Sequence, residues 1–345
     1  MVRFCDDYSE GCHESILKVL MDTAYEQTDT YGLDIYTQHA SDRIHELIGS
    51  NSAVHFLVGG TQANLVMISS VLRPYQAVIS AETGHIATHE SGAIESSGHK
   101  VIPVPSKDGK VNADQIRQVF CSHYSDPTAE HMPQPAMLYI SQPTEVGTLY
   151  SFSELKALSQ VCKEFRAPLY MDGARLGCAL TSPYNDINLS DLPKVTDAFT
   201  IGGTKMGAMF GEALVINNLA LDLDLRYMIK RSGGLLAKGR LLGIQFDVLL
   251  KDDLYFKLAK HANSMAFQLA DGIRRAGYSF QYPVQSNQIF PILPAAFLDS
   301  VRNSFLWTAE HPVQSKMAGI RLCASWATQQ ENIDRFLSEL ENWES

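Results

Sequence analysis

The chain has 345 residues, of which 45% are hydrophobic and 19% charged, and its formal net charge is −10. This length is enough for a sizeable core divided between two domains, and the composition excludes a disordered protein. Because the balance is acidic and no run of Lys and Arg occurs, a nucleic-acid surface is excluded as the main function.

Membrane and secreted classes are also disfavoured. No apolar run approaches the roughly 20 residues that a membrane span requires, and the acidic start, MVRFCDDYSE, is unlike a signal peptide. The six cysteines are scattered without CxxC spacing, so we interpret them as reduced thiols, mostly in the core. We therefore expect a cytoplasmic protein without membrane or nucleic-acid partners.

Short apolar segments alternate with helical patterns through the first two thirds of the chain. The strand-like segments are 54–58, 77–80, 100–104, 136–140, 168–172, 198–201 and 213–216, and amphipathic segments cover 61–72 and 152–165. This alternation predicts a mostly parallel α/β sheet with helices on both faces. Glycine and polar residues cluster after the strand ends, where ligand sites of open α/β sheets lie.

The pattern changes after about residue 220. Residues 225–270 are nearly continuous helix-like sequence, broken at Ser232-Gly233-Gly234. Strand-like segments follow at 278–280, 288–292 and 320–324, and a final amphipathic helix is predicted over 330–343. This part of the chain predicts a small α+β C-terminal domain.

Lys205 and Asp172 form the first candidate pair for chemistry. Lys205 follows a buried strand in a glycine-rich turn, although a single lysine in a turn is more often a surface charge. A lysine that forms a Schiff base requires partial burial and a nearby positive charge to lower its amine pKa. Asp172 ends the preceding strand, where it could cap a helix. It could equally keep the pyridine nitrogen of pyridoxal phosphate (PLP) protonated. Together the two residues predict a PLP site.

Two further segments fit a cofactor less specifically. The turn Val58-Gly59-Gly60-Thr61 opens a helix, and its N–H groups and dipole would suit a phosphate, as many similar turns would. His85 could stack on the pyridine ring or be an ordinary loop residue. The spacing of His85 and His89 also resembles a metal pair, but no glutamate lies between them as in a metalloprotease helix. We predict no metal site.

The sequence resembles the threonine aldolase / β-eliminating lyase family of PLP enzymes. The resemblance lies in VHFLVGGTQAN, GHIATHESGAIESSGHKV, MDGARL, IGGTK and LAKGRLLGIQF, and it extends from Phe4 past Arg321. It implies the aspartate-aminotransferase-like PLP fold type I, with a mostly parallel seven-stranded sheet and a small α+β domain. We assign the large PLP-binding domain to residues 16–235 and the small domain to residues 236–345. Residues 1–15 are expected to contribute to the active site.

The resemblance also implies roles for single residues. Lys205 corresponds to the Schiff-base lysine and Asp172 to the partner of the pyridine nitrogen. Arg175 corresponds to an arginine that contacts PLP and the substrate carboxylate. Arg321 corresponds to the small-domain arginine that binds this carboxylate, a task that suits a guanidinium fork. An arbitrary arginine would more often form a surface ion pair. The residues implied for the cofactor are Gly60, Thr61, Gln62, His85, Asp172, Arg175 and Lys205.

The chain departs from the family pattern at two places near the substrate. Where many members have Thr-His-Asn, this chain has Thr144-Glu145-Val146, so Glu145 replaces a histidine that is proposed as the base in some members. Near the N-terminus, Asp6-Asp7-Tyr8-Ser9 stands where many members have Ser-Asp, and we assign Ser9 to the substrate site. The base is left open between His85, acting directly or through a water, and Glu145.

The resemblance implies an aldolase that cleaves β-hydroxy-α-amino acids of the threonine, allo-threonine and phenylserine type. Retro-aldol cleavage of the Cα–Cβ bond would give glycine and an aldehyde. The alternatives are β-elimination, racemisation or transamination on the same scaffold and, more remotely, a non-catalytic partner-binding protein. A homodimer or homotetramer is implied, with sites at the dimer interface and cross-subunit contacts at 31–36 and 230–240.

Overall fold

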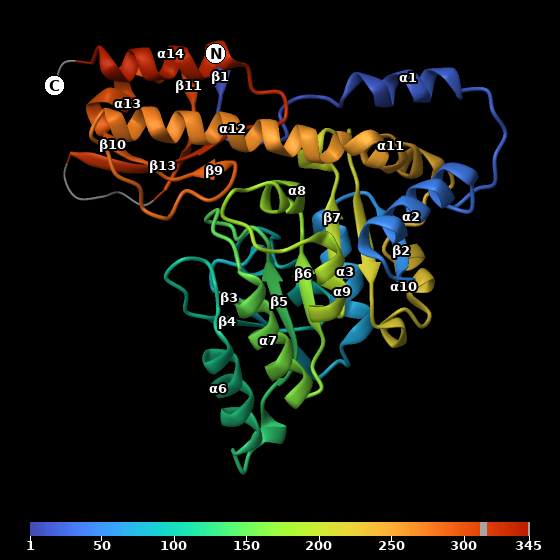
Figure 1. The fold of residues 1–345 in the computed structure, drawn as a ribbon. Coiled ribbons are helices and arrows are strands. Elements are labelled where there is room, and N and C mark those ends of the chain that lie inside the picture. Colours follow the sequence, from blue (N-terminus) through green and yellow to red (C-terminus); the bar gives the residue numbers. More distant parts are fainter. Residues whose placement is uncertain (311–315, 344–345) are drawn as a thin grey trace.

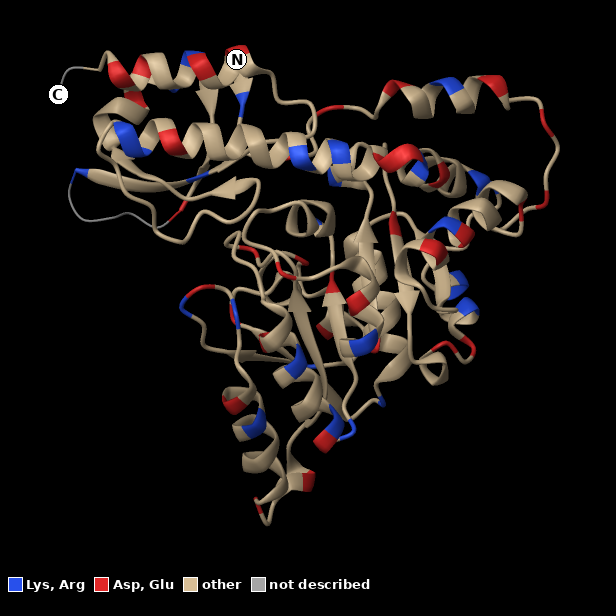
Figure 2. Cartoon of the chain, in the orientation of Figure 1, with Lys and Arg blue, Asp and Glu red and all other residues tan. Residues whose placement is uncertain are grey.

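The computed structural model describes residues 1–310 and 316–343. A large α/β unit contains the main sheet, and a smaller unit formed chiefly by the C-terminal part of the chain lies across one end of it (Figure 1). Among the described residues, no helix is both long and apolar enough to cross a bilayer. Acidic and basic residues are interspersed along the helices of both units (Figure 2).

The main sheet has seven strands in the order β2-β8-β7-β6-β5-β3-β4. The neighbours from β7 to β4 pair in parallel, whereas β8 runs antiparallel to both β2 and β7. This confirms the predicted mostly parallel seven-stranded sheet. The strands are β2 (Ala53–Leu57), β3 (Gln76–Ala81), β4 (Val101–Val104), β5 (Gln134–Ser141), β6 (Leu169–Asp172), β7 (Ala198–Gly202) and β8 (Glu212–Ile216).

Helices cover both faces of this sheet. In β5, Met137 and Tyr139 belong to one buried cluster while Leu138 and Ile140 belong to another, as expected when successive side chains point to opposite faces. The first eleven helices in chain order are α1 (Glu14–Asp22), α2 (Ile35–Ile48), α3 (Gly60–Val71), α4 (His85–Thr88), α5 (Ala93–Ser96), α6 (Ala113–Tyr124), α7 (Phe152–Glu164), α8 (Leu176–Leu180), α9 (Leu192–Val195), α10 (Leu225–Arg231) and α11 (Arg240–Leu250).

The smaller unit has its own hydrophobic core, built around Phe297, Phe305 and Phe336. Its long helix α12 (Leu254–Arg275) packs against α8 of the large unit and against α14 (Gln330–Glu341), so it connects the two units. The remaining elements are β1 (Val2–Arg3), β9 (Gln288–Ile289), β10 (Ile292–Pro294), α13 (Ala295–Val301), β11 (Phe305–Leu306), β12 (Thr308–Ala309) and β13 (Met317–Cys323).

The N-terminus belongs spatially to the smaller unit, because β1 pairs in parallel with β11. Residues 1–15 then run from this unit to the large one, where the N–H of His13 donates to the carbonyl of Gly207. The division at 15/16 and 235/236 stays a prediction, and the last two residues assigned to the small domain, 344–345, lie outside the described residues.

The C-terminal part differs from the predicted pattern at three places. The helical stretch 225–270 is broken at 232–239 and again at 251–253, where Asp252 and Asp253 have positive φ of 52° and 58°. Residues 278–280 form no named strand, only an isolated bridge between Phe280 and Pro291. The predicted strand 288–292 is divided into β9 and β10, because Pro291 lacks an N–H to donate to a ladder.

Candidate active site

A cavity of about 340 Å³ opens where β5, β6 and β7 end, next to the first turn of α3. Its volume is at the lower end of the roughly 300–1,000 Å³ typical of small-molecule sites. A larger groove of about 710 Å³ is lined by other residues, among them Lys100, His123 and Asp126. The predicted site residues that line the cavity are Gly60, Thr61, His85, Glu145, Asp172, Arg175 and Lys205.

Lys205 lies in a single 3₁₀ turn directly after β7, where the chain passes very close to its neighbour. A Cβ on Gly202 would lie 2.3 Å from the carbonyl oxygen of Ala174, so only glycine permits this approach. Burial, followed by the charge of Arg175, lowers the pKa of the Lys205 amine. A larger share of neutral amine is the condition for attack on a carbonyl carbon.

Asp172 is a buried carboxylate at the end of β6. It accepts hydrogen bonds from Asn64 Nδ2 at 2.9 Å, from the Tyr139 hydroxyl at 2.7 Å and from the Ala174 N–H at 2.9 Å. Burial alone would raise the pKa of Asp172, but these donors and the nearby His85 outweigh it, and the pKa is lowered. The carboxylate is therefore held ionised.

The first turn of α3 presents backbone N–H groups to the cavity through Gly60 and Thr61. Its N-cap is Gly59, and no described side chain caps this end by a hydrogen bond. The Gln62 side chain points elsewhere, since its Oε1 accepts from the Val58 N–H at 3.2 Å and its Nε2 donates to the Ser232 carbonyl at 3.1 Å. A cofactor role for Gln62 stays a prediction.

His85 begins α4 and has one ring nitrogen fixed by a carboxylate. Its Nδ1 lies 2.8 Å from Glu90 Oε1, which also accepts from Asn64 Nδ2 at 2.7 Å. A carboxylate partner places the proton on Nδ1 and leaves Nε2 as the acceptor. Asn64 thus connects the His85–Glu90 pair with Asp172. Sequence reasoning missed Asn64 and Glu90, although a polar residue in the apolar helix α3 was an available signal.

Glu145 lies in the loop after β5 and contacts His85 directly. Its Oε1 accepts from the His85 N–H at 2.8 Å and from the Ser141 hydroxyl at 2.5 Å. Burial raises the pKa of the Glu145 carboxyl. Glu145, one of the two residues predicted as the base, therefore also holds the backbone of His85, the other candidate.

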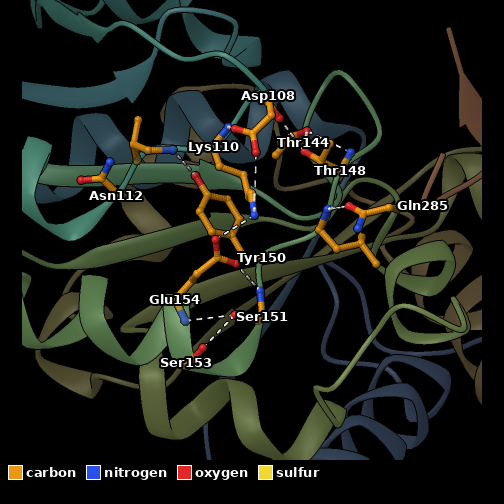
Figure 3. A network of polar contacts seen from close by, with 12 residues as sticks. Asp108, Lys110, Asn112, Thr144, Thr148, Tyr150, Ser151, Ser153, Glu154 and Gln285 are labelled. Carbon is orange, nitrogen blue, oxygen red and sulfur yellow. Dashed lines mark hydrogen bonds and ion pairs between the residues drawn. The ribbon is translucent and has the colours of Figure 1, made fainter. Parts of the chain in front are cut away.

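The loop that carries Glu145 is held from several sides (Figure 3). The Thr148 hydroxyl donates to the Asp108 carbonyl at 2.6 Å, and the Leu149 N–H donates to Gln285 Oε1 at 2.9 Å. The Tyr150 hydroxyl accepts from the Val111 N–H at 2.8 Å. These partners come from distant parts of the chain, so the loop has a fixed position relative to the sheet.

The N-terminal segment reaches the cavity through Asp7 and Tyr8. Asp7 is fully buried and pairs with Arg175 at 2.7 and 3.0 Å, while Tyr8 lines the cavity. Burial would raise the pKa of Asp7, but the charges of Arg175 and Lys205 lower it. Ser9 is exposed and bonds to Asp6 and Arg3, so its predicted substrate contact stays a prediction.

Arg321 on β13 lies outside the cavity lining. Its Nη2 donates to the Cys5 carbonyl at 3.1 Å and to the Thr308 hydroxyl at 3.2 Å. Partial burial lowers the pKa of His89, and the charges of His85, Arg321 and Arg175 lower it further. Both arginines therefore lie close to the same histidine, and a shared carboxylate site stays a prediction.

Glu212 is a further acidic residue of the cavity, and sequence reasoning missed it. It begins β8 and is 3% exposed. The sequence did contain a signal for it, because Glu212 is a charged residue directly before the apolar segment 213–216. Within the described ranges, no three His, Cys, Asp or Glu side chains are grouped to hold a metal ion.

The chain is similar in sequence to known proteins. The family model described as beta-eliminating lyase matches residues 5–296. The low specificity L-threonine aldolase of Pseudomonas sp. (strain NCIMB 10558) is 32% identical, over 97% of this chain and 95% of that protein. The protein of the same name from Pseudomonas aeruginosa is 33% identical, over 95% of this chain and 93% of that protein.

Solved structures confirm the predicted fold. A Leishmania major threonine aldolase superposes with a TM-score of 0.96 at 44% identity, covering 99% of both chains. Aspartate aminotransferase from Thermus thermophilus has a TM-score of 0.72 at 14% identity, covering 99% of this chain and 91% of that one. The chain thus has the aspartate-aminotransferase-like fold with a small C-terminal sheet domain.

Proposed function

The chain belongs to the beta-eliminating lyase family, and from this premise we propose that it is a PLP-dependent aldolase. Its substrates would be β-hydroxy-α-amino acids of the threonine type, cleaved between Cα and Cβ to glycine and an aldehyde. The observation that carries the proposal is the convergence of Lys205, Asp172 and the first turn of α3 on one cavity. The two Pseudomonas aldolases, similar over nearly their whole length, support the choice of reaction.

The residues present fit PLP. The Lys205 amine, with its lowered pKa, would attach the aldehyde carbon of the cofactor. The ionised Asp172 would pair with a protonated pyridine nitrogen, and the N–H groups at Gly60 and Thr61 would hold the phosphate. When bound, PLP supplies an electron sink for the pair of electrons left at Cα.

The remaining groups would orient the substrate and move its proton. Arg175 and Arg321 are the groups we assign to the α-carboxylate, because a guanidinium binds a carboxylate with a fixed orientation. His85 Nε2 would take the proton from the β-hydroxyl, directly or through a water, because Glu90 holds Nδ1 in the donor form. Glu145 would act chiefly by holding the His85 backbone.

We also propose an assembly of two or four copies. Leu33 and Ile35 are 67% and 53% exposed, and Tyr227 is 76% exposed on α10. The two segments predicted for cross-subunit contacts pack on each other, since Lys230 Nζ lies 4.7 Å from the centre of the Tyr31 ring. An apolar surface of this kind is typical of a subunit contact. A cytoplasmic location is part of the same proposal.

The aldolase proposal is tested by measuring glycine and acetaldehyde released from L-threonine and L-allo-threonine by the PLP-loaded protein. Replacing Lys205 by Ala should reduce release by roughly 10⁴-fold or more, the order seen when a covalent catalytic group is lost. Lys194→Ala is the matched control, because Lys194 is exposed and its ion pair among the described residues is with Asp191, three residues before it. It should retain full activity.

A protein that binds PLP but releases no glycine from either substrate contradicts the aldolase proposal. In that case, formation of a keto acid from an amino acid would indicate transamination or β-elimination on the same scaffold. A Lys205→Ala variant with undiminished release would show that the attachment residue is wrong.

A further inference from the structure

Glu212 is a buried carboxyl in the cavity that the proposed reaction does not use. It lies opposite Leu57 of β2 and Gly202 of β7 in the sheet register. Its Oε2 is buried and has no hydrogen-bond partner among residues 1–310 and 316–343. Because an unpaired buried carboxylate is costly, this position requires either a proton on the group or a ligand beside it.

Glu212 faces the turn that begins α3. A Cβ added to Gly60 would lie 3.9 Å from Glu212 Oε1, the nearest heavy atom to that position. The helix has 12 residues, and no described side chain caps its N-terminus. An uncapped helix N-terminus attracts an anion. An anion bound there would lie next to the Glu212 carboxyl.

The charged and titratable groups around Glu212 come from β6, from the segments that follow β6 and β7, and from α12. Asp172 and Tyr170 belong to β6, Arg175 follows it, Lys205 follows β7, and Tyr255 belongs to α12. Burial, followed by the charge of Asp172, raises the pKa of Glu212 to about 8, while Lys205 and Arg175 act in the opposite direction. The group is therefore neutral below about pH 8 and ionised above it.

We propose that the protonated Glu212 carboxyl donates a hydrogen bond to the phosphate group of the bound cofactor, so that phosphate and one proton bind together. The inference rests on the proposed function for the identity of the phosphorylated ligand. An ionised Glu212 would repel a phosphate bound at the first turn of α3, because like charges close together in a protein interior are poorly screened. The proton comes from solvent, and no covalent bond changes.

The test uses pyridoxine 5′-phosphate, which lacks the aldehyde that Lys205 would bond, with pyridoxine as the probe without phosphate. Titration calorimetry from about pH 7 to about pH 9.5, in buffers of different ionisation enthalpy, gives the affinity and the protons taken up. The phosphate monoester is already dianionic in this range, because its second pKa is about 6. Above pH 8 the affinity of the wild type should fall by up to about tenfold per pH unit, with about one proton taken up.

Glu212→Gln keeps a hydrogen-bond donor but cannot titrate. It should bind pyridoxine 5′-phosphate at pH 7 within about threefold of the wild type and lose the fall in affinity above pH 8. The exposed Glu339 on α14 provides the matched control, and Glu339→Gln should keep the wild-type profile. Pyridoxine should show the same pH profile in wild type and Glu212→Gln.

Equal pH slopes in wild type and Glu212→Gln overturn the inference, as does a folded Glu212→Gln variant that no longer binds at pH 7. A protein that binds the phosphorylated probe at no pH overturns both the inference and the proposed cofactor site. If the two profiles differ as expected but no glycine is released from threonine, the Glu212 inference holds and only the aldolase proposal fails.

Discussion

Glu145 and Glu212 line the same cavity, and burial raises the pKa of both carboxyls. Their surroundings differ. Glu145 Oε1 accepts two hydrogen bonds, from the His85 N–H and the Ser141 hydroxyl, and belongs to a loop anchored at several points. Glu212 heads a sheet strand, and its Oε2 has no partner within the part of the chain that the structure describes.

The difference follows from the backbone at each position. The first turn of α4 supplies the His85 N–H and the end of β5 supplies the Ser141 hydroxyl, and neither group is used in a sheet ladder, so both can donate to Glu145. Strand β8 pairs on both sides, so the N–H groups around Glu212 are used in the sheet. The protein itself therefore satisfies Glu145, whereas Glu212 is left for a proton and a ligand.

The largest contrast should appear when Glu145 is replaced by Leu. The His85 N–H would lose its acceptor, and the Ser141 hydroxyl would keep only its longer contact of 3.3 Å with the Tyr139 hydroxyl. An unsatisfied donor costs about 1–3 kcal/mol. We expect the free energy of unfolding of the apoprotein to fall by about 2–3 kcal/mol in urea titrations. Glycine release should fall as well, through a lower kcat, because the His85 backbone would lose its support.

Glu145→Gln separates the hydrogen bonds from the charge. The amide oxygen can still accept from the His85 N–H and the Ser141 hydroxyl, so this variant should stay within about 1 kcal/mol of the wild type. If Glu145→Gln is as unstable as Glu145→Leu, the acceptor role of Oε1 is wrong.

Glu212→Leu should have the opposite sign. Replacing a buried carboxyl whose Oε2 has no partner among the described residues by an apolar side chain should stabilise the apoprotein by about 1–3 kcal/mol at pH 7. The same urea titration measures it. A destabilised Glu212→Leu apoprotein would remove the contrast between the two glutamates.

The size of this gain should depend on pH in a defined direction. The pKa of Glu212 is about 8 in the folded chain and 4.5 as the reference value, so the folded state holds a proton that the unfolded state has released. The stability that this group contributes is fully present below about pH 4.5 and is lost as the pH rises through about 8. The advantage of Glu212→Leu should therefore grow as the pH rises across this window, which urea titrations at several pH values would measure.

The sheet could be predicted from the sequence because its strands are short apolar runs that end at glycine or polar residues. Each of the seven predicted strand segments overlaps a strand of the main sheet. The small domain was less predictable. Its short strands depend on single residues such as Pro291. Its strand β11 pairs with residues 2–3, about 300 residues away in the sequence, and no local sequence pattern predicts such a pairing.

The candidate site could be predicted where a residue ends a strand, as Asp172 does, or follows a strand within a few residues, as Lys205 does. The side chains that determine the charge of the site residues could not be predicted in this way. Asn64 and Asp7 act across more than 100 residues of sequence, on Asp172 and Arg175 respectively. Glu212 was missed because its significance lies in having no partner within the described chain. Glu145 was found only because it differs from a family pattern, and its anchoring needed coordinates.

The smallest effect should come from loosening that anchoring at Tyr150. Its hydroxyl accepts the Val111 N–H, and both residues are buried. Tyr150→Phe removes one hydrogen bond and should lower the free energy of unfolding by about 1 kcal/mol. Tyr124→Phe, on the half-exposed Tyr124 of α6, is the control and should change nothing measurable.

If the Glu145 loop acts through its fixed position, Tyr150→Phe should also lower kcat for glycine release by a few-fold while leaving cofactor binding unchanged. Glu212 belongs to the sheet and not to this loop, so its pH profile for pyridoxine 5′-phosphate should be the same in Tyr150→Phe as in the wild type. A shifted pH profile would mean that Glu145 and Glu212 are coupled through the cavity. The two carboxyls would then belong to one connected network and could not be treated as independent cases.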